Sequence, residues 1–154
     1  MAKSAPTGSA ARLVSVGYAG RSVEGLCADL ADLSVSILVD VRLNAISRKP
    51  GFSKRALRQA LETAGIAYRH EPLLGNPADN RQSFRTGDAA LGCTRFRRRL
   101  ENGSAEALQR VSALASQSCV AILCVEREER ECHRQVILEA VASALPGVPI
   151  ARLS

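Results

Sequence analysis

The chain has 154 residues, of which 46% are hydrophobic and 23% charged, and these values are typical of a single globular domain. Its apolar runs all fall short of the roughly 18 residues that a membrane span needs, which argues against a transmembrane segment and a membrane partner. The 21 lysines and arginines outnumber the 15 acidic residues, and the resulting net charge of +6 favours an anionic partner.

Residues Met1–Ala11 are mostly small and polar, and they include a proline. They lack the apolar stretch of a signal peptide and are predicted to form a disordered tail, so that one domain spans residues 12–154. The five cysteines are an odd number without the dense spacing of a secreted disulfide scaffold. We therefore expect mostly reduced thiols and a cytoplasmic location.

Short aliphatic runs rich in β-branched residues predict the strands. In chain order they are Leu13–Val16, Val35–Val41, Ile66–Arg69, Cys119–Val125 and Val148–Leu153. Apolar residues at helical spacing predict helices after Ser22 and Ser53, which are candidate N-caps. Further helices are predicted at Arg95–Leu100, Ala105–Ser116 and Arg134–Leu145. Residues 75–93 are rich in Gly, Asn, Pro and Asp and predict a long irregular loop.

This alternation of strands and helices predicts a single three-layer α/β/α domain with a mostly parallel sheet. In such sheets ligands bind outside the carboxyl ends of the strands. The unusual polar motifs follow four of the predicted strands, whereas the turns at the opposite edge are plain. The four polar motifs are Gly17–Ser22, Asp40–Ser53, His70–Asn76 and Glu126–Arg134. We therefore expect one site, at this edge, for an anionic ligand.

Glycines, hydroxyls and cations in these loops suit the binding of a phosphate, which needs donors from several directions. The candidate ligand-binding residues are Tyr18, Gly20, Arg21, Asp40, Arg42, Ser47, Arg48, Lys49, Asn76 and Arg134. The alternatives are a tight turn for the glycines, a solvated basic loop around Arg48, and an Asp40 that only orients Arg42.

Cys132 and His133 lie where a helix begins, and a helix N-terminus lowers the pKa of a thiol. Glu126 is placed to orient or deprotonate His133, so we interpret His133, Cys132 and Glu126 as candidate catalytic residues. An alternative is a transition-metal site at Cys124, Cys132 and His133. Because the Cys-x-x-Cys spacing is missing and a fourth ligand is unassigned, we assign no metal ligand and interpret Cys124 as a buried strand residue.

The basic run at Arg95 and 97–99 has a single phenylalanine within it. On a helix it would form an exposed basic stripe, which supports a second hypothesis, a nucleic-acid-binding module without catalysis. A stripe of this kind is also common on a solvated helix face.

Taken together, these motifs resemble the uncharacterised domain-of-unknown-function family 488 (DUF488). They are Gly17-Tyr18-Ala19-Gly20-Arg21-Ser22, Asp40-Val41-Arg42, Ser47-Arg48-Lys49-Pro50-Gly51-Phe52-Ser53, Leu74-Gly75-Asn76, and Cys124 followed by Cys132-His133-Arg134. The resemblance runs from about Leu13 to the C-terminus. It implies an α/β fold and a bacterial cytoplasmic protein, but it implies no reaction.

Our leading hypothesis is a pocket for a phosphate-bearing or other anionic ligand, such as a nucleotide or a nucleic-acid fragment. In it Arg21, Arg42, Arg48 and Arg134 clamp the anion, and His133 and Cys132 lie nearest to any chemistry. The sequence specifies no cofactor, no substrate and no oligomeric state.

Overall fold

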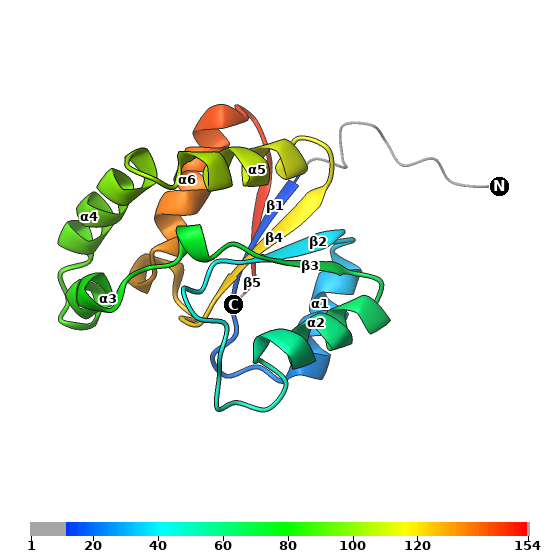
Figure 1. Ribbon diagram of the computed structural model, residues 1–154. Helices are drawn as coiled ribbons and strands as arrows, with labels where there is room; N and C mark the ends of the chain where they lie inside the picture. Colours follow the sequence, from blue (N-terminus) through cyan, green and yellow to red (C-terminus); the bar gives the residue numbers. More distant parts are fainter. Residues whose placement is uncertain (1–11, 154) are drawn as a thin grey trace.

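The computed structural model describes residues 12–153, so the predicted tail at 1–11 lies outside the described residues. Within this range five strands form one parallel sheet in the order β3-β2-β4-β1-β5 (Figure 1). The strands are β1 (Arg12–Gly17), β2 (Ile37–Asp40), β3 (Ala67–His70), β4 (Cys119–Cys124) and β5 (Ile150–Leu153). The predicted α/β domain with a parallel sheet is confirmed.

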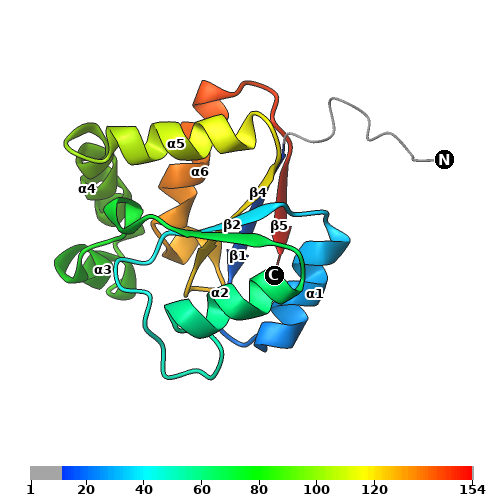
Figure 2. The same ribbon diagram turned by 45° about the vertical axis from the view of Figure 1, so that its right-hand side comes forward.

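Six α-helices flank the sheet in the described part of the chain. They are α1 (Val23–Asp32), α2 (Lys54–Thr63), α3 (Ala78–Arg85), α4 (Ala89–Glu101), α5 (Ala105–Ala115) and α6 (Arg134–Ala144). The first two pack on one face, while α4, α5 and α6 pack on the other, and Figure 2 shows the sheet between these two groups. The predicted three layers are therefore present.

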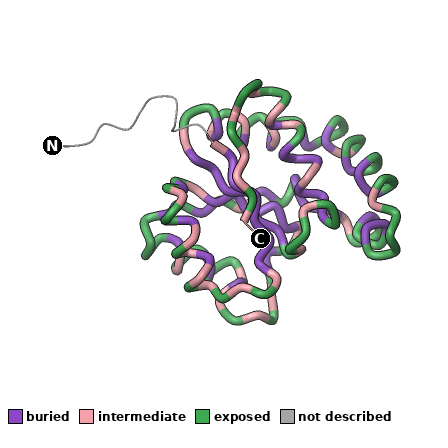
Figure 3. Tube along the Cα trace, turned by 180° about the vertical axis from the view of Figure 1, so that it is seen from behind, coloured by how far each residue is buried: buried purple, intermediate pink, exposed green. Residues whose placement is uncertain are grey.

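Residues of the central strand β4 alternate between the two cores. Val120 and Ile122 belong to the core under α4, α5 and α6, whereas Ala121 and Leu123 belong to the core under α1 and α2. All six residues of β4 are buried, which explains why this strand reads as a continuous apolar run. The buried trace in Figure 3 runs through the strands, and the exposed trace lies mainly in helices and loops.

The prediction of a long loop at residues 75–93 is wrong. The segment contains α3 and the beginning of α4, and a short 3₁₀ helix, η2 (Pro72–Leu74), precedes it. Pro77 and Asp88 lie at the helix starts, and Asp88 accepts a hydrogen bond from the Leu91 N–H. Gly92 is buried inside α4, where a Cβ would collide with the ring of Phe84. The residues that suggested a loop therefore serve as caps and as a close helix contact.

The two predicted N-caps differ in the structure. Ser22 caps α1, because its side chain accepts the Gly25 N–H at 3.0 Å. Ser53 precedes α2 without a capping hydrogen bond. Its hydroxyl instead accepts the Ser47 N–H at 3.0 Å and donates to the Ser47 carbonyl at 3.1 Å, which closes the loop between them.

Several predicted strands are too long at their ends. The second was expected from Val35 but begins at Ile37, and the last was expected from Val148 but begins at Ile150. In residues 12–153 no helix has both the length and the apolar character to cross a membrane.

Candidate functional site

Two loops meet at the boundary between the neighbouring strands β2 and β4, at their carboxyl ends. The chain leaves β2 toward α2 on one face of the sheet and leaves β4 toward α6 on the other. A boundary of this kind opens a crevice, which is where ligands bind in open parallel sheets. Glycines let these loops approach their neighbours, because a Cβ on Gly17 would overlap the Glu126 backbone and one on Gly75 the Leu43 backbone.

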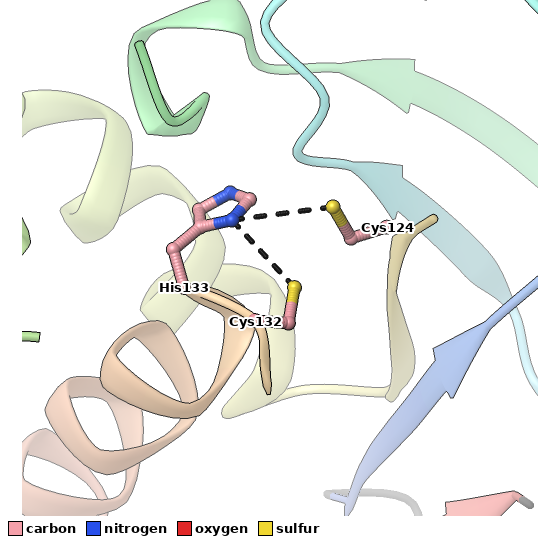
Figure 4. A group of neighbouring side chains, drawn as sticks. All are labelled: Cys124, Cys132 and His133. Carbon is pink, nitrogen blue, oxygen red and sulfur yellow. Dashed lines mark hydrogen bonds between the residues drawn. The ribbon is translucent and has the colours of Figure 1, made fainter. Parts of the chain in front are cut away.

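Three side chains with metal-binding or nucleophilic atoms converge in this crevice. Cys124 ends β4, while Cys132 and His133 immediately precede α6 (Figure 4). The Nδ1 atom of His133 lies 3.6 Å from Sγ of Cys132 and 4.0 Å from Sγ of Cys124. All three residues are buried, so their interactions are weakly screened by water.

The imidazole of His133 has a fixed orientation. Its Nε2 atom lies 3.0 Å from the carbonyl oxygen of Val41, which can only accept a hydrogen bond, so Nε2 carries a proton and donates. Nδ1 therefore faces the two sulfurs and is the nitrogen that exchanges its proton with them. The ring of Phe96 packs edge-on against the imidazole at 4.8 Å between centroids.

The pKa values of the two thiols are shifted in opposite directions. A hydrogen bond from Cys132, together with the nearby His133, lowers the pKa of Cys124 well below its ordinary value. Burial and the charge on Cys124 raise the pKa of Cys132 well above its ordinary value. Burial alone would lower the pKa of His133, but the charge on Cys124 and the hydrogen bonds with Cys124 and Val41 together outweigh it and raise this pKa. Cys124 is therefore the thiol that ionises first, beside an imidazole of increased basicity.

Cys132 and Cys124 have different further contacts. The sulfur of Cys132 accepts the backbone N–H of Arg134 at 3.3 Å and a guanidinium N–H of the same residue at 3.6 Å. The sulfur of Cys124 lies 3.7 Å from a carboxylate oxygen of Glu126. Burial and the charge on Cys124 raise the pKa of Glu126. Glu126 thus completes a cluster of four groups that compete for protons.

Two small hollows open above this cluster. One, of about 70 Å³, reaches Cys132 and Arg85, and the other, of about 90 Å³, reaches Cys124 and Arg42. Both are also lined by Asn76, Arg81, Glu126 and His133. The cluster therefore has access to a polar cavity that carries an exposed cation, Arg81.

Asp40 and Arg42 form a buried ion pair beside the site. The guanidinium donates to both carboxylate oxygens, at 2.8 Å from Nε and 2.6 Å from Nη2, and Nη1 donates to the Phe52 carbonyl at 2.7 Å. The hydroxyl of Tyr68 donates to the same carboxylate at 2.6 Å. Burial alone would lower the pKa of Arg42, but the hydrogen bond with Asp40 raises it. This network fixes the backbone at Val41, the partner of His133.

A profile of the family described as "Domain of unknown function DUF488" matches residues 22–141, most of the chain. The chain belongs to the DUF488 family. The matched range contains the whole cluster and the residues lining both hollows, so the site is part of the DUF488 domain itself. No solved structure gives a significant match. The family description names no activity, and the chemistry of this DUF488 domain has to be argued from its site.

The DUF488 structure brings together only some of the predicted site residues. Glu126, Cys132, His133 and Asn76 line the hollows together with an edge of Arg42. Gly20, Arg21 and Lys49 instead line a separate open depression with Ser22, Val23, Glu24, Pro50 and Gly51. The residues predicted to surround one anion therefore line two separate sites, the hollows above His133 and this open depression.

Several of the predicted residues make contacts within the protein. Tyr18 stacks on Phe52 at 4.4 Å between ring centroids, Arg21 pairs with Asp29 at 2.7 Å, and the Ser47 hydroxyl accepts the Lys49 N–H at 3.0 Å. Arg48 is exposed. Arg134 is 1% exposed and donates to Ser15 Oγ at 2.8 Å and the Glu126 carbonyl at 3.0 Å. We assign Arg42 and Arg134 a positioning role, and the ligand-binding roles of the other residues stay predictions.

Sequence reasoning missed Arg81 and Arg85, and it placed Cys124 in the cluster only as part of the metal-site alternative. Both arginines belong to α3, which was interpreted as loop, and their spacing of four places them on one helix face. Recognising Pro77 and Asp79 as a helix start would have revealed that face. Cys124 was interpreted as a core residue because it ends an apolar run, and only its position at the last residue of β4 distinguishes it.

Proposed function

We propose that this DUF488 domain binds a small anionic ligand, the phosphate-bearing group of a nucleotide or nucleic-acid fragment, in the hollows above His133. The observation that carries this proposal is that Arg81, Asn76 and His133 line both hollows. Arginine is the side chain best suited to planar, bidentate contacts with phosphate or carboxylate. The Asn76 oxygen accepts a hydrogen bond from Asn80 at 2.9 Å, which leaves its NH₂ group to donate to a ligand.

The size of the hollows supports an anionic group rather than a whole nucleotide as the enclosed part. Their volumes are about 70 and 90 Å³, whereas pockets that enclose drug-sized ligands measure about 300–1,000 Å³. A water molecule occupies about 30 Å³ of the liquid, so each hollow has room for a few waters or one phosphate group. The rest of a larger ligand would lie outside, toward the exposed Arg85.

Any chemistry on the bound group falls to the residues beneath it. His133, Cys132 and Glu126 are the proposed reacting or positioning groups, and the structure adds Cys124 to them. All five cysteines are free thiols, which supports the proposed cytoplasmic setting. The bacterial origin implied by the family resemblance stays a prediction.

Thermal shift with a series of probes tests the anion proposal. Inorganic phosphate and adenosine monophosphate are expected to raise the Tm of the full chain, and uncharged adenosine is expected to leave it unchanged. Arg81→Gln should reduce the shift, whereas Arg98→Gln, at an exposed position on α4, should retain it. A wild type that no anion stabilises, or an Arg81→Gln variant with an unchanged shift, would overturn the proposal.

Arg42→Ala is unsuitable for this test, because it breaks the buried pair with Asp40 and confounds binding with folding.

The alternative, a nucleic-acid-binding module, has less support, because most side chains of the basic run at Arg95 and 97–99 already contact the protein. Arg95 donates to Ser83, Arg97 to Glu139 and Arg99 to the Gly75 carbonyl, so these side chains are partly engaged within the protein. Binding of an oligonucleotide whose affinity falls steeply with salt and is lost in Arg98→Gln would favour that alternative.

A further inference from the structure

We infer that Cys124, Cys132, His133 and Glu126 form a site for a single divalent transition-metal ion with a preference for sulfur and nitrogen ligands, of which Zn²⁺ is the best match. This goes beyond anion binding, because it assigns the cluster an ion of its own. Two thiolates, an imidazole and a carboxylate are all established ligand types for Zn²⁺.

Three separations within the cluster are close to those of a tetrahedral site. With Zn–S near 2.3 Å and Zn–N or Zn–O near 2.1 Å, neighbouring ligand atoms in a tetrahedron lie about 3.6 Å apart. The observed separations are 3.6 Å from Cys132 Sγ to His133 Nδ1, 4.0 Å from Cys124 Sγ to His133 Nδ1, and 3.7 Å from Cys124 Sγ to the Glu126 carboxylate. Three of the donor atoms lie within 4.8 Å of one another. These three separations need shifts of a few tenths of an ångström, and the two sulfurs, which lie within 4.8 Å of each other, would approach by up to about 1 Å to coordinate one ion.

The surroundings of the ligands are those of a metal centre. A ligating histidine usually donates its other ring N–H to a carbonyl or carboxylate, and His133 donates Nε2–H to the Val41 carbonyl. The sulfur of Cys132 accepts two N–H groups of Arg134, which offset the charge of a thiolate. Arg134 donates to Ser15, so the positions of the Arg134 guanidinium and of the Cys132 sulfur are fixed before an ion binds.

The ligands come from two separate elements. Cys124 is the last residue of β4 and Glu126 follows it, whereas Cys132 and His133 precede α6, with the short 3₁₀ helix η3 (Glu129–Glu131) between the two pairs. The sheet and α6 bring the pairs together, and for this reason the sequence spacing does not resemble a zinc motif. Cys124, Cys132 and His133 are buried, whereas Glu126 is partly exposed and lines both hollows.

The partial exposure of Glu126 makes its position the exchangeable one. Catalytic zinc sites keep three protein ligands and an open position for water or substrate, and three buried ligands plus an accessible carboxylate fit that arrangement. A dication would also offset the negative charges of Glu126 and Cys124 beside the hollows. The ion would thereby strengthen the attraction of an anion, but its own binding does not depend on one.

Titration of the reduced, metal-free full chain with Co²⁺ tests the inference. A tetrahedral site with two thiolates is expected to give a sulfur-to-cobalt charge-transfer band and intense visible bands that saturate at one ion per chain. Zn²⁺ should abolish these bands by displacing Co²⁺. Protein purified without a metal-binding tag should contain zinc at a similar stoichiometry by elemental analysis.

Variants separate the cluster from the other thiols. Cys124→Ser should lose the charge-transfer bands, whereas Cys27→Ser, a thiol on α1 outside the cluster, should retain them. Glu126→Gln should keep the bands and weaken Co²⁺ binding by at least about tenfold. Circular dichroism checks that each variant is folded, and the wild-type titration itself requires no variant.

Two results would overturn the inference. One is a folded wild type, shown to be reduced because all five thiols are titratable after unfolding, that gives no charge-transfer band on addition of Co²⁺. The other is an equal band in a folded Cys124→Ser. Phosphate binding by the metal-free protein is read separately by thermal shift, so failure of the metal site and failure of the anion site are distinguishable.

Discussion

His133 and Val41 are joined by a hydrogen bond of 3.0 Å between Nε2 and the carbonyl oxygen, although 92 positions separate them in the sequence. Because the acceptor is a backbone atom, the orientation of the imidazole depends on where β2 ends and not on the side chain at position 41. The end of β2 is in turn fixed by Asp40 and Arg42 on either side of Val41. The geometry of the site therefore depends on a buried ion pair outside the cluster.

Replacement of Asp40 by Asn is expected to destabilise the fold strongly. It would leave the buried guanidinium of Arg42 without its counter-charge, and breaking a buried pair in this way costs about 3–5 kcal/mol. The free energy of unfolding from urea titration measures the loss. Glu139→Gln is the control, because its pair with Arg97 is exposed and contributes only about 0–1 kcal/mol. Equal losses in the two variants would contradict a structural role for the Asp40 pair.

Ser15 and Arg134 are expected to act as a unit. Ser15→Ala removes the acceptor for Arg134 Nε, and a buried donor left unsatisfied costs about 1–3 kcal/mol. Arg134→Lys loses the same contact together with those to Glu126 and Cys132. A double-mutant cycle in urea should therefore show a double variant that is less destabilised than the sum of the single changes. Additive losses would show that the two side chains are energetically independent.

The stabilising effect of Glu71 is expected to disappear in acid. Hydrogen bonds from Arg110 and Arg69 lower the pKa of this carboxyl in the folded protein. The folded pKa thus lies below the unfolded value of about 4.3, so the contribution is fully present above that value and is lost as the pH falls through the folded pKa.

Comparison of wild type with Glu71→Gln by urea unfolding between about pH 7 and pH 3 measures this loss. The difference in the free energy of unfolding should be largest at neutral pH and should shrink below about pH 4. Glu62→Gln, at an exposed position on α2, serves as the control and should change the stability by less than about 0.5 kcal/mol at neutral pH. A difference for Glu71→Gln that grows in acid would contradict the assignment.

Gly17→Ala is expected to disturb the site as well as the fold. The new Cβ would overlap the backbone of Glu126, so the loop that carries this carboxylate must move. We expect a lower Tm and weaker Co²⁺ binding. Gly65→Ala is the matched control, because no neighbouring atom lies within 4 Å there and its positive φ of 81° adds only a local strain of about 1–2 kcal/mol. Its Co²⁺ binding should be unchanged, and an equal loss in both variants would refute the link between Gly17 and the site.

The parts of the fold that could be predicted are those governed by local pattern. The apolar runs that form β1 and β4 are recognisable because both faces of each strand are covered. The helix at Arg95–Leu100 was predicted within α4, but α3 and the beginning of α4 were obscured because Gly92 fits only against Phe84, and this contact between helices leaves no local signature. Arg81 was missed for the same reason, since its position depends on α3 being a helix.

The site could be predicted to the extent that topology determines it. Cys132 and His133 could be placed at a helix start near the carboxyl edge of the sheet, and Glu126 could be placed beside them. Asp40 could be named as a partner of Arg42, but Tyr68, which donates to Asp40, and Ser15, which accepts from Arg134, become neighbours of these residues only through the strand order. The sequence identifies a cationic side chain at such an edge. It does not show whether that side chain is available to a ligand or is already hydrogen-bonded within the protein.

The position of β4 between β1 and β2 has a consequence for the order of folding. The two early strands do not pair with each other, and each pairs with β4. During synthesis the chain must therefore reach Cys124 before the centre of the sheet can close, and it must reach His133 before the cluster is complete. Such non-local pairing slows folding, and until then β1 and β2 have unpaired edges that can associate with other chains. Cys124, which belongs to the site, is thus also part of the strand whose pairing covers the exposed edges of β1 and β2.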